Sequence, residues 1–498
     1  VRGSTLVRLK MIVSDYIDPT DKSHSPHRKY RIGDVRYSYD RSTSSPIWLR
    51  PNVLKRANSL IPGDIYRDSN LSDTYARLNR LGAVAATNVR LEPDTQDSTL
   101  LNANIVITPA RLNSIQLGLD GTNTAGDLGA AANFTYQNRN VFHGSEIFSL
   151  KFRTAFEAIR GLKGYADQNY FEYSIETGLQ FPDFIFPFIT RDFRRRAKAN
   201  TEFNLMFASQ DRPEFHRRVL TASWKYRWNN ANANQQHRFD LLDVNYVFMP
   251  WISDTFYDTY IKDPENRNAI IAYNYKNLFI VKLGYQYQYS SAGLASPMGI
   301  YGKDAYTVRF AVETAGNLLH GICNLADTKV NEDGHRTLFN IAYAQYAKFD
   351  FDISKSIRFS NRTSLALHFA LGVAYPYGNS DILPYEKRYF SGGANSVRGW
   401  SVRSLGPGSF IGNDGNIDFI NQTGDVKLDM SAELRVHLFW KFDGAFFVDA
   451  GNIWTLRDYK DQPGGQFRWD TCWEQIAVAY GLGLRLNLNY FLLRFDAG

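Results

Sequence analysis

Residues 478–488 read Val-Ala-Tyr-Gly-Leu-Gly-Leu-Arg-Leu-Asn-Leu, in which apolar side chains alternate with polar or small ones. Successive side chains of a β-strand point to opposite faces, so this stretch predicts a strand with one apolar and one polar face. The same alternation returns in residues 171–181, 220–228, 281–289 and 365–371. From residue 111 to residue 498 the pattern predicts a mainly β domain of about fifteen strands.

Two all-β architectures produce this alternation. A water-soluble sandwich packs its apolar faces inward, whereas a membrane β-barrel turns them to lipid and fills its interior with polar side chains. Segments of about ten residues, aromatic side chains near strand ends, and Gly, Ala and Ser among the charges of the polar face favour the transmembrane antiparallel barrel. Periodicity alone leaves the sandwich open.

Composition excludes several classes of protein. An aromatic content of 15% is incompatible with intrinsic disorder, and no run approaches the ~18 apolar residues of a membrane-spanning helix. Cys323 and Cys472 are too few for a disulfide framework and have no neighbouring zinc ligands. The net charge of +7 comes without a basic cluster, so no nucleic-acid partner is predicted. The scattered histidines form no catalytic pattern, and the sequence predicts neither an enzyme nor a cofactor or metal site.

The first 110 residues follow a different, mixed pattern. Pro51 marks a helix start, and Leu71, Tyr75 and Leu78 are spaced along one face of a second helix. Two strands follow, at residues 84–91 and 101–108. We therefore expect a small α+β domain over residues 29–110 in the order β-α-α-β-β. Residues 1–28 are expected to be the end of a preceding module of the same kind, with a linker.

A connection of about fifty residues, 376–424, is far longer than the loops of compact domains. Its centre, residues 389–400, reads Tyr-Phe-Ser-Gly-Gly-Ala-Asn-Ser-Val-Arg-Gly-Trp. A segment rich in glycine and aromatic residues does not have the composition of a flexible linker. The sequence predicts an ordered loop that folds inward.

Arg398 in this loop requires a partner if it is partly dehydrated, and arginine pairs best with carboxylates. Strand phase places Glu433 on the polar face of one following strand and Asp449 on the polar face of the next. Both carboxylates can therefore meet Arg398 inside a barrel. The alternative is a surface loop whose arginine is solvated.

The loop motif Gly392, Gly393, Val397, Arg398, Gly399 and Trp400 resembles the sixth-loop motif of the outer-membrane assembly-factor superfamily that contains BamA and TamA. By the same resemblance, residues 29–110 are similar to the last periplasmic polypeptide-transport-associated (POTRA) module, and residues 111–498 to the barrel. Residues 138–144 are similar to the characteristic turn after the second strand. The resemblance also implies that Glu433 and Asp449 are the barrel-wall carboxylates that hold the motif arginine.

Two features depart from the family pattern. Trp400 stands where the best-known members have Phe or Tyr, a conservative exchange of large aromatic residues. Barrels of the family have sixteen strands, whereas residues 491–496 match the fifteenth, so the closing strand is expected to be missing from this sequence. The sequence of the loop around the motif resembles that of the TamA-like lipoproteins of Bacteroidetes.

The resemblance implies a non-enzymatic insertase in the bacterial outer membrane, with its N-terminal domain in the periplasm. Its expected partners are unfolded outer-membrane protein clients, the lipid bilayer, and periplasmic or lipoprotein assembly factors. The barrel would open at a lateral seam beside its first strand, where Ile115, Leu117 and Leu119 face lipid and Gly118 weakens strand pairing. In the plainer interpretation this strand only closes the barrel.

Two rival functions remain open. A two-partner secretion transporter of the same superfamily would export a dedicated exoprotein. A passive porin, from a different class of protein, would conduct small solutes. The α+β module and the arginine loop argue against the porin.

Overall fold

The computed structural model describes the following residues: 6–13, 28–32, 35–39, 48–97, 99–124, 127–158, 169–188, 190, 199–212, 215–229, 234–258, 273, 275–293, 304–331, 334–411, 422–488 and 492–498. The chain divides into two compact units. One comprises residues 1–120, 131–154 and 174–205, and the other comprises residues 121–130, 155–173 and 206–498.

The N-terminal part contains a five-stranded sheet in the order β2-β3-β1-β5-β4. Its elements are β1 (Leu6–Val13), β2 (Arg28–Ile32), β3 (Val35–Tyr39), α1 (Pro51–Ala57), α2 (Asp68–Asn79), β4 (Val84–Pro93) and β5 (Leu100–Pro109). Pro51 opens α1, where its missing N–H group costs no hydrogen bond. Leu54 of α1, Leu78 of α2 and Ile105 of β5 are fully buried in one apolar cluster, which joins both helices to the sheet.

The structure differs from the sequence prediction for residues 1–28. Strand β1 pairs in parallel with β5, from Leu6 opposite Leu100 to Val13 opposite Ile107, and also with β3. It therefore lies inside the same sheet as β4 and β5 and does not end a preceding module. The physical reason is that the β4–β5 hairpin leaves one edge of β5 open, and β1 satisfies its backbone groups. Parallel pairing over such a sequence separation leaves no local signal in the sequence.

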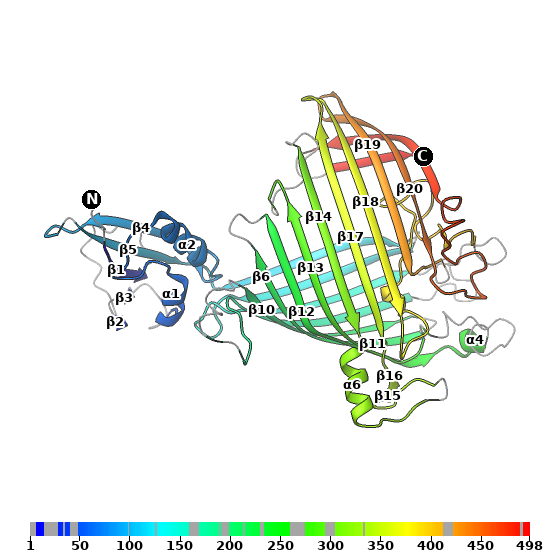
Figure 1. The fold of residues 1–498 in the computed structure, drawn as a ribbon, viewed down its shortest axis with the longest axis horizontal. Coiled ribbons are helices and arrows are strands. Elements are labelled where there is room, and N and C mark those ends of the chain that lie inside the picture. The colour runs from blue at the N-terminus through cyan, green and yellow to red at the C-terminus, as the bar shows by residue number, and fades with distance from the viewer. Residues whose placement is uncertain are drawn as a thin grey trace. The chain divides into compact units, whose positions relative to one another are not determined.

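The described residues after β5 build a fifteen-stranded sheet, in agreement with the predicted number of strands. Its order is β22-β21-β20-β19-β18-β17-β14-β13-β12-β11-β10-β9-β8-β7-β6. Every pair from β11 to β22 is antiparallel. Figure 1 shows the strands of this sheet in colours from cyan to red. The first nine strands are β6 (Asn113–Thr124), β7 (Asp127–Asn138), β8 (Ile147–Ala158), β9 (Asn169–Phe181), β10 (Asn200–Asp211), β11 (Phe215–Asn229), β12 (Gln235–Ile252), β13 (Leu278–Ser290) and β14 (Ala305–Ala315). The other six are β17 (Tyr346–Arg358), β18 (Thr363–Pro376), β19 (Val426–Phe439), β20 (Phe442–Trp454), β21 (Ala477–Asn487) and β22 (Leu492–Ala497).

The two faces of the sheet differ as the alternation predicts. In β21, Tyr480 and Leu482 are 72% and 67% exposed, whereas Ala479 and Arg485 on the other face are 6% and 3% exposed. The outward face of β21 is thus apolar and uncovered, and its polar face is buried. Such a surface is the opposite of a soluble sandwich, whose apolar faces pack against each other.

Connections at one end of the sheet are long and structured. The connection between β14 and β17 carries α6 (Asn317–Leu325) and the two-stranded ribbon β15 (Thr337–Leu338) and β16 (Ile341–Ala342). A short helix, α4 (Asp254–Tyr257), follows β12, and a 3₁₀ turn, η2 (Tyr385–Lys387), lies between β18 and β19. Among the described residues, no helix combines the length and the apolar character that crossing a membrane requires.

Candidate functional site

Hydrogen bonds close the connection between β18 and β19 at its base. The backbone groups of Tyr389 and Gly424 exchange two hydrogen bonds of 2.8 Å each. The Tyr389 hydroxyl donates to Oδ1 of Asp350 on β17 at 2.7 Å. Beside it, Nζ of Lys387 lies 2.7 Å from Oε1 of Glu313 on β14. The entry of the loop is therefore tied to the polar face of two strands.

The motif glycines permit a tight turn. Gly392 and Gly393 both have φ of +96°, a region that residues with a Cβ rarely adopt. A Cβ on Gly392 would lie 2.3 Å from the carbonyl oxygen of Ser401. The turn is closed by a hydrogen bond of 2.8 Å from Gly393 N to the carbonyl oxygen of Trp400.

Val397 anchors the motif by burial. Its side chain is fully buried against Leu405 and Ala479, and Trp400 is partly buried against the same cluster. Gly399 lies so close to the wall that a Cβ there would come within 2.9 Å of the Ala479 Cβ. Ala479 belongs to β21, so the motif packs directly on the polar face of the sheet.

Arg398 extends from this turn to two strands of the wall. Its Nε and Nη2 donate to the two oxygens of Asp449 on β20, at 2.7 and 2.9 Å. Its Nη1 donates to Oε2 of Glu433 on β19 at 2.8 Å. The structure thus brings together the three residues that the sequence singled out. The pairing with Asp449 is bidentate, the geometry for which the planar guanidinium is suited.

The surroundings of Arg398 keep its charge. Its guanidinium carbon lies 3.5 Å from the centre of the Phe447 ring, a cation–π contact. Burial lowers the pKa of Arg398, but its hydrogen bonds to Asp449 and Glu433 outweigh burial and raise that pKa above its ordinary value. Arg398 therefore stays a cation at any physiological pH.

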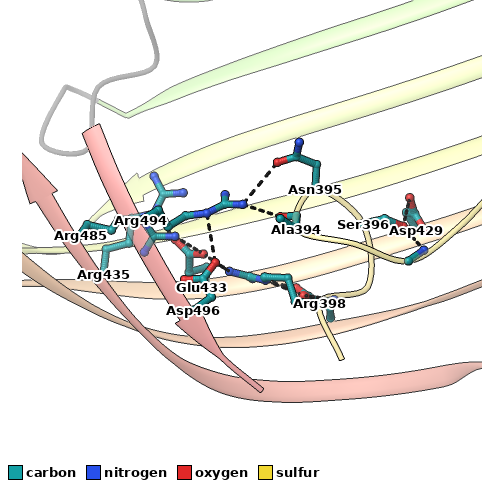
Figure 2. A network of polar contacts seen from close by, with 12 residues as sticks. Ala394, Asn395, Ser396, Arg398, Asp429, Glu433, Arg435, Arg485, Arg494 and Asp496 are labelled. Carbon is teal, nitrogen blue, oxygen red and sulfur yellow. Dashed lines mark hydrogen bonds and ion pairs between the residues drawn. The ribbon is translucent and has the colours of Figure 1, made fainter. Parts of the chain in front are cut away.

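Glu433 is shared among three arginines, as Figure 2 shows. Besides Arg398, it accepts hydrogen bonds from Arg485 of β21, at 2.7 Å, and from Arg435 of its own strand. Glu433 is 5% exposed, and a buried carboxylate needs such partners to remain ionised. One carboxylate therefore links the loop to both β19 and β21.

A third carboxylate, which the sequence analysis missed, comes from strand β22. Oδ2 of Asp496 lies 3.3 Å from Nη1 of Arg398 and 3.1 Å from Nε of Arg494. Arg494 also donates to the carbonyl oxygen of Ala394 in the motif, at 2.6 Å (Figure 2). Two contacts therefore join the loop to β22, one from an arginine of the loop and one from an arginine of the strand. The available signal was the two-residue spacing of Arg494 and Asp496, which puts both on one face of a strand.

A second missed contact holds the motif backbone. The Ser396 hydroxyl lies 3.0 Å from both carboxylate oxygens of Asp429 on β19. Lys427 is 2.7 Å from the same carboxylate. Asp429 shares a face of β19 with Glu433, four residues further on, but nothing in the sequence links it with Ser396.

We expect Asp496→Asn to loosen the motif from β22 without unfolding the sheet. The amide removes one of three negative charges around Arg398, while Glu433 and Asp449 still pair with it. The loss of unfolding free energy should be about 1.5–3 kcal/mol, as for a hydrogen bond to a charged group. Chemical denaturation in detergent measures this loss, and Asp458→Asn in another connection is the control. A loss equal to that of removing Arg398 itself would contradict this division of roles.

The predicted seam residues lie on β6, at one end of the sheet order. Within the described residues β6 pairs only with β7, and β22 only with β21, so both are edge strands. Ile115, Leu117 and Leu119 are 66%, 76% and 89% exposed. A Cβ on Gly118 would meet the Asn133 side chain at an ordinary 3.7 Å. An edge strand presents backbone groups to which another strand can pair.

The turn after β7 is bound to the segment before α1. The backbone N of Arg50 donates to the carbonyl oxygen of His143 at 2.8 Å, and the Arg50 side chain is 3.0 Å from Glu146. Nδ2 of Asn140 donates to the carbonyl oxygen of Trp48 at 2.6 Å. The predicted turn at residues 138–144 thus contacts the α+β domain at several points.

Cys323 and Cys472 are buried free cysteines. The described part of the chain holds no group of three or more His, Cys, Asp or Glu residues arranged to bind a metal ion.

The outward apolar face, the buried polar face and the inward arginine loop are those of a membrane β-barrel. Residues 123–498 match the Omp85 superfamily domain, and the chain belongs to this family. It is also 31% identical over 107 residues to the outer membrane protein assembly factor BamA of Neisseria meningitidis serogroup B. That match covers 20% of this chain and 13% of the relative.

One solved structure supports the fold. BamA from Haemophilus ducreyi lacking POTRA domains 1–3 matches with a TM-score of 0.58 and 14% identity, covering 95% of this chain and 85% of that chain. CdiB from Acinetobacter baumannii matches with a TM-score of 0.45 and 14% identity, covering 93% of this chain and 71% of that chain. The protein is therefore a transmembrane antiparallel β-barrel preceded by a small α+β domain, as the alternation and the motif predicted.

Proposed function

We propose that this protein inserts unfolded outer-membrane proteins into the bilayer through a lateral seam beside β6, the first strand of its large sheet. The main support for this proposal is the arginine loop. In it, Arg398 forms ion pairs with Glu433 of β19, Asp449 of β20 and Asp496 of β22. The loop motif thereby braces the strands that lead to one edge of the sheet.

The physical basis of insertion is backbone hydrogen bonding. A strand that enters hydrocarbon with unpaired N–H and C=O groups is strongly disfavoured. An edge such as β6 offers these groups partners, so that a client strand can be added by β-augmentation. The arginine loop would keep the polar face of β19 to β22 in place while the edge exchanges partners.

The α+β domain would act as a periplasmic POTRA module that receives the client. The ion pair of Arg50 with Glu146 joins this domain to the turn after β7. A client bound by the domain would therefore be held near the start of β6. Periplasmic or lipoprotein assembly factors would be further partners. The matched relative is by name an assembly factor, which supports this reading of the chain.

Disulfide trapping tests the proposal. In the full-length protein, Leu117→Cys on β6 should cross-link to a cysteine in the terminal strand of an arriving client. Leu220→Cys on β11 is the matched control, because it is also an exposed leucine but its strand is paired on both sides. We expect client adducts at position 117 and none above background at position 220.

Two outcomes would contradict insertion at this edge. Equal adducts at both positions would mean that the client contacts the barrel without strand addition. A trapped exoprotein passing through the interior would indicate the two-partner transporter, and a large steady conductance without client adducts would indicate a porin.

A further inference from the structure

Helix α6 rests on the outward face of the barrel wall. Its Leu319 and Cys323 are buried together with Val281 of β13 and Tyr343, against the partly buried Val244. Val281 and Leu283 share the outward face of β13, because they are two residues apart on a regular strand. Val281 is 7% exposed under the helix, whereas Leu283 beyond it is 43% exposed.

Backbone hydrogen bonds fix both ends of this connection to β13. Gly316, which precedes α6, donates to the carbonyl oxygen of Val281 at 2.9 Å. Ala344, which follows β16, donates to the carbonyl oxygen of Phe279 at 2.9 Å. In Figure 1, α6, β15 and β16 lie side by side at the end of the strands. The helix is therefore held against the wall as a defined element.

A second apolar stripe of α6 is left uncovered. Leu318, Ile322 and Leu325 are 60%, 46% and 92% exposed, and their spacing of four and three residues puts them on one side of the helix. Asn317 and Asn324, seven residues apart, share a different side. The helix is amphipathic, and its apolar arc exceeds the part that packs on β13.

The neighbouring turn adds an exposed aromatic ring. Phe339 and Asn340 connect β15 to β16 with φ of +53° and +62°. Such two-residue turns favour Asn and Gly, and a bulky side chain there is disfavoured. Phe339 is nevertheless 85% exposed, so no packing within the described residues compensates for its backbone conformation.

We propose that α6 and the β15–β16 ribbon are a lipid-seated element, whose stripe of Leu318, Ile322 and Leu325 lies among the acyl chains of the adjoining leaflet. The occupant is lipid because the stripe continues the outward apolar face of the wall, on which Leu283 and Val312 are also exposed. In a membrane β-barrel that face is in contact with hydrocarbon. An amphipathic helix with its apolar side at the headgroup boundary is stabilised by the same burial.

This element would fix the depth of the β12–β14 wall in the bilayer. Its role is independent of the client and of the arginine loop, because it depends only on the barrel being embedded.

Depth-dependent quenching tests the proposal on the full-length protein in phosphatidylcholine vesicles. A polarity-sensitive fluorophore is attached at Leu325→Cys, at Phe339→Cys and, as a matched control, at Asn324→Cys. The native Cys323 and Cys472 are buried, and the parent chain treated with the same reagent gives the background. All three positions are exposed, so the substitutions leave the core intact.

We expect blue-shifted emission at positions 325 and 339, quenched several-fold by lipids with a nitroxide on the acyl chain. Position 324 should emit as in water and should be quenched far less. Water-like emission at position 325 in vesicles, or equal quenching at positions 324 and 325, would overturn the proposal. A signal at 325 that shifts only when a second protein is added would also overturn it, in favour of a protein-binding surface.

Discussion

Replacing Arg398 with alanine is expected to lower the free energy of unfolding of the barrel by about 3–5 kcal/mol, the usual cost of removing one partner from a buried ion pair. The change leaves Asp449, Glu433 and Asp496 facing one another without the cation that joins them. All three carboxylates belong to wall strands, so the loop loses the side chain that anchors it and should detach from the wall. Urea denaturation in detergent and chymotrypsin cleavage after Trp400 of the motif measure the two effects.

Two variants control this result. Arg403→Ala removes another arginine of the same connection, one that contacts Phe390 and Tyr385 through their rings, and should cost about 1 kcal/mol or less. Arg398→Lys keeps the charge but cannot form the bidentate pair with Asp449, so it should fall between the parent chain and Arg398→Ala. If Arg398→Ala were as stable as Arg403→Ala and its client assembly were unchanged, the loop would not brace the strands.

Gly392→Ala is expected to disrupt the motif almost as strongly, although it removes no contact. Alanine at φ of +96° is strained, which costs roughly 1–3 kcal/mol, and its Cβ would lie 2.3 Å from the Ser401 carbonyl oxygen. The turn must open, and Arg398 is then displaced from the carboxylates. Denaturation and motif proteolysis should show a change of the same kind as in Arg398→Ala.

The matched control is Gly321→Ala in α6. A Cβ there meets no atom within 4 Å, and alanine is about 1 kcal/mol more favourable than glycine inside a helix. This variant should be as stable as the parent chain or slightly more so. If the Gly392→Ala protein had the stability of the parent chain and its motif resisted proteolysis equally well, the tight turn would not be required to hold the loop against the wall.

The barrel could be predicted because its signal is local. Each strand carries its own alternation, as residues 478–488 do, and the count of strands needs no knowledge of pairing. Arg398, Glu433 and Asp449 could be named from strand phase together with the family motif. Their meeting depends on adjacent strands, β19 and β20, whose order along the sheet follows their order in the sequence.

The rest required three-dimensional information. Asp496 contacts Arg398 because the order of strands in the sheet places β22 beside the motif. No spacing in the sequence shows this contact. The place of β1 in the first sheet depends on parallel pairing with β5, which is distant in sequence. In β12 the pairing shifts register between Asp240 and Asp243, where an extra residue breaks the simple alternation.

The convergence of Arg398, Arg435 and Arg485 on Glu433 restricts how this region can evolve. A single codon change that neutralises Glu433 leaves Arg398 paired with Asp449 and Asp496, but it takes from Arg435 and the buried Arg485 the carboxylate that they share. Neutralising Glu433 is therefore expected to be tolerated best when the buried Arg485 of β21 is exchanged with it. Glu433 thus couples the loop, β19 and β21, so that a substitution at this one position affects all three at once.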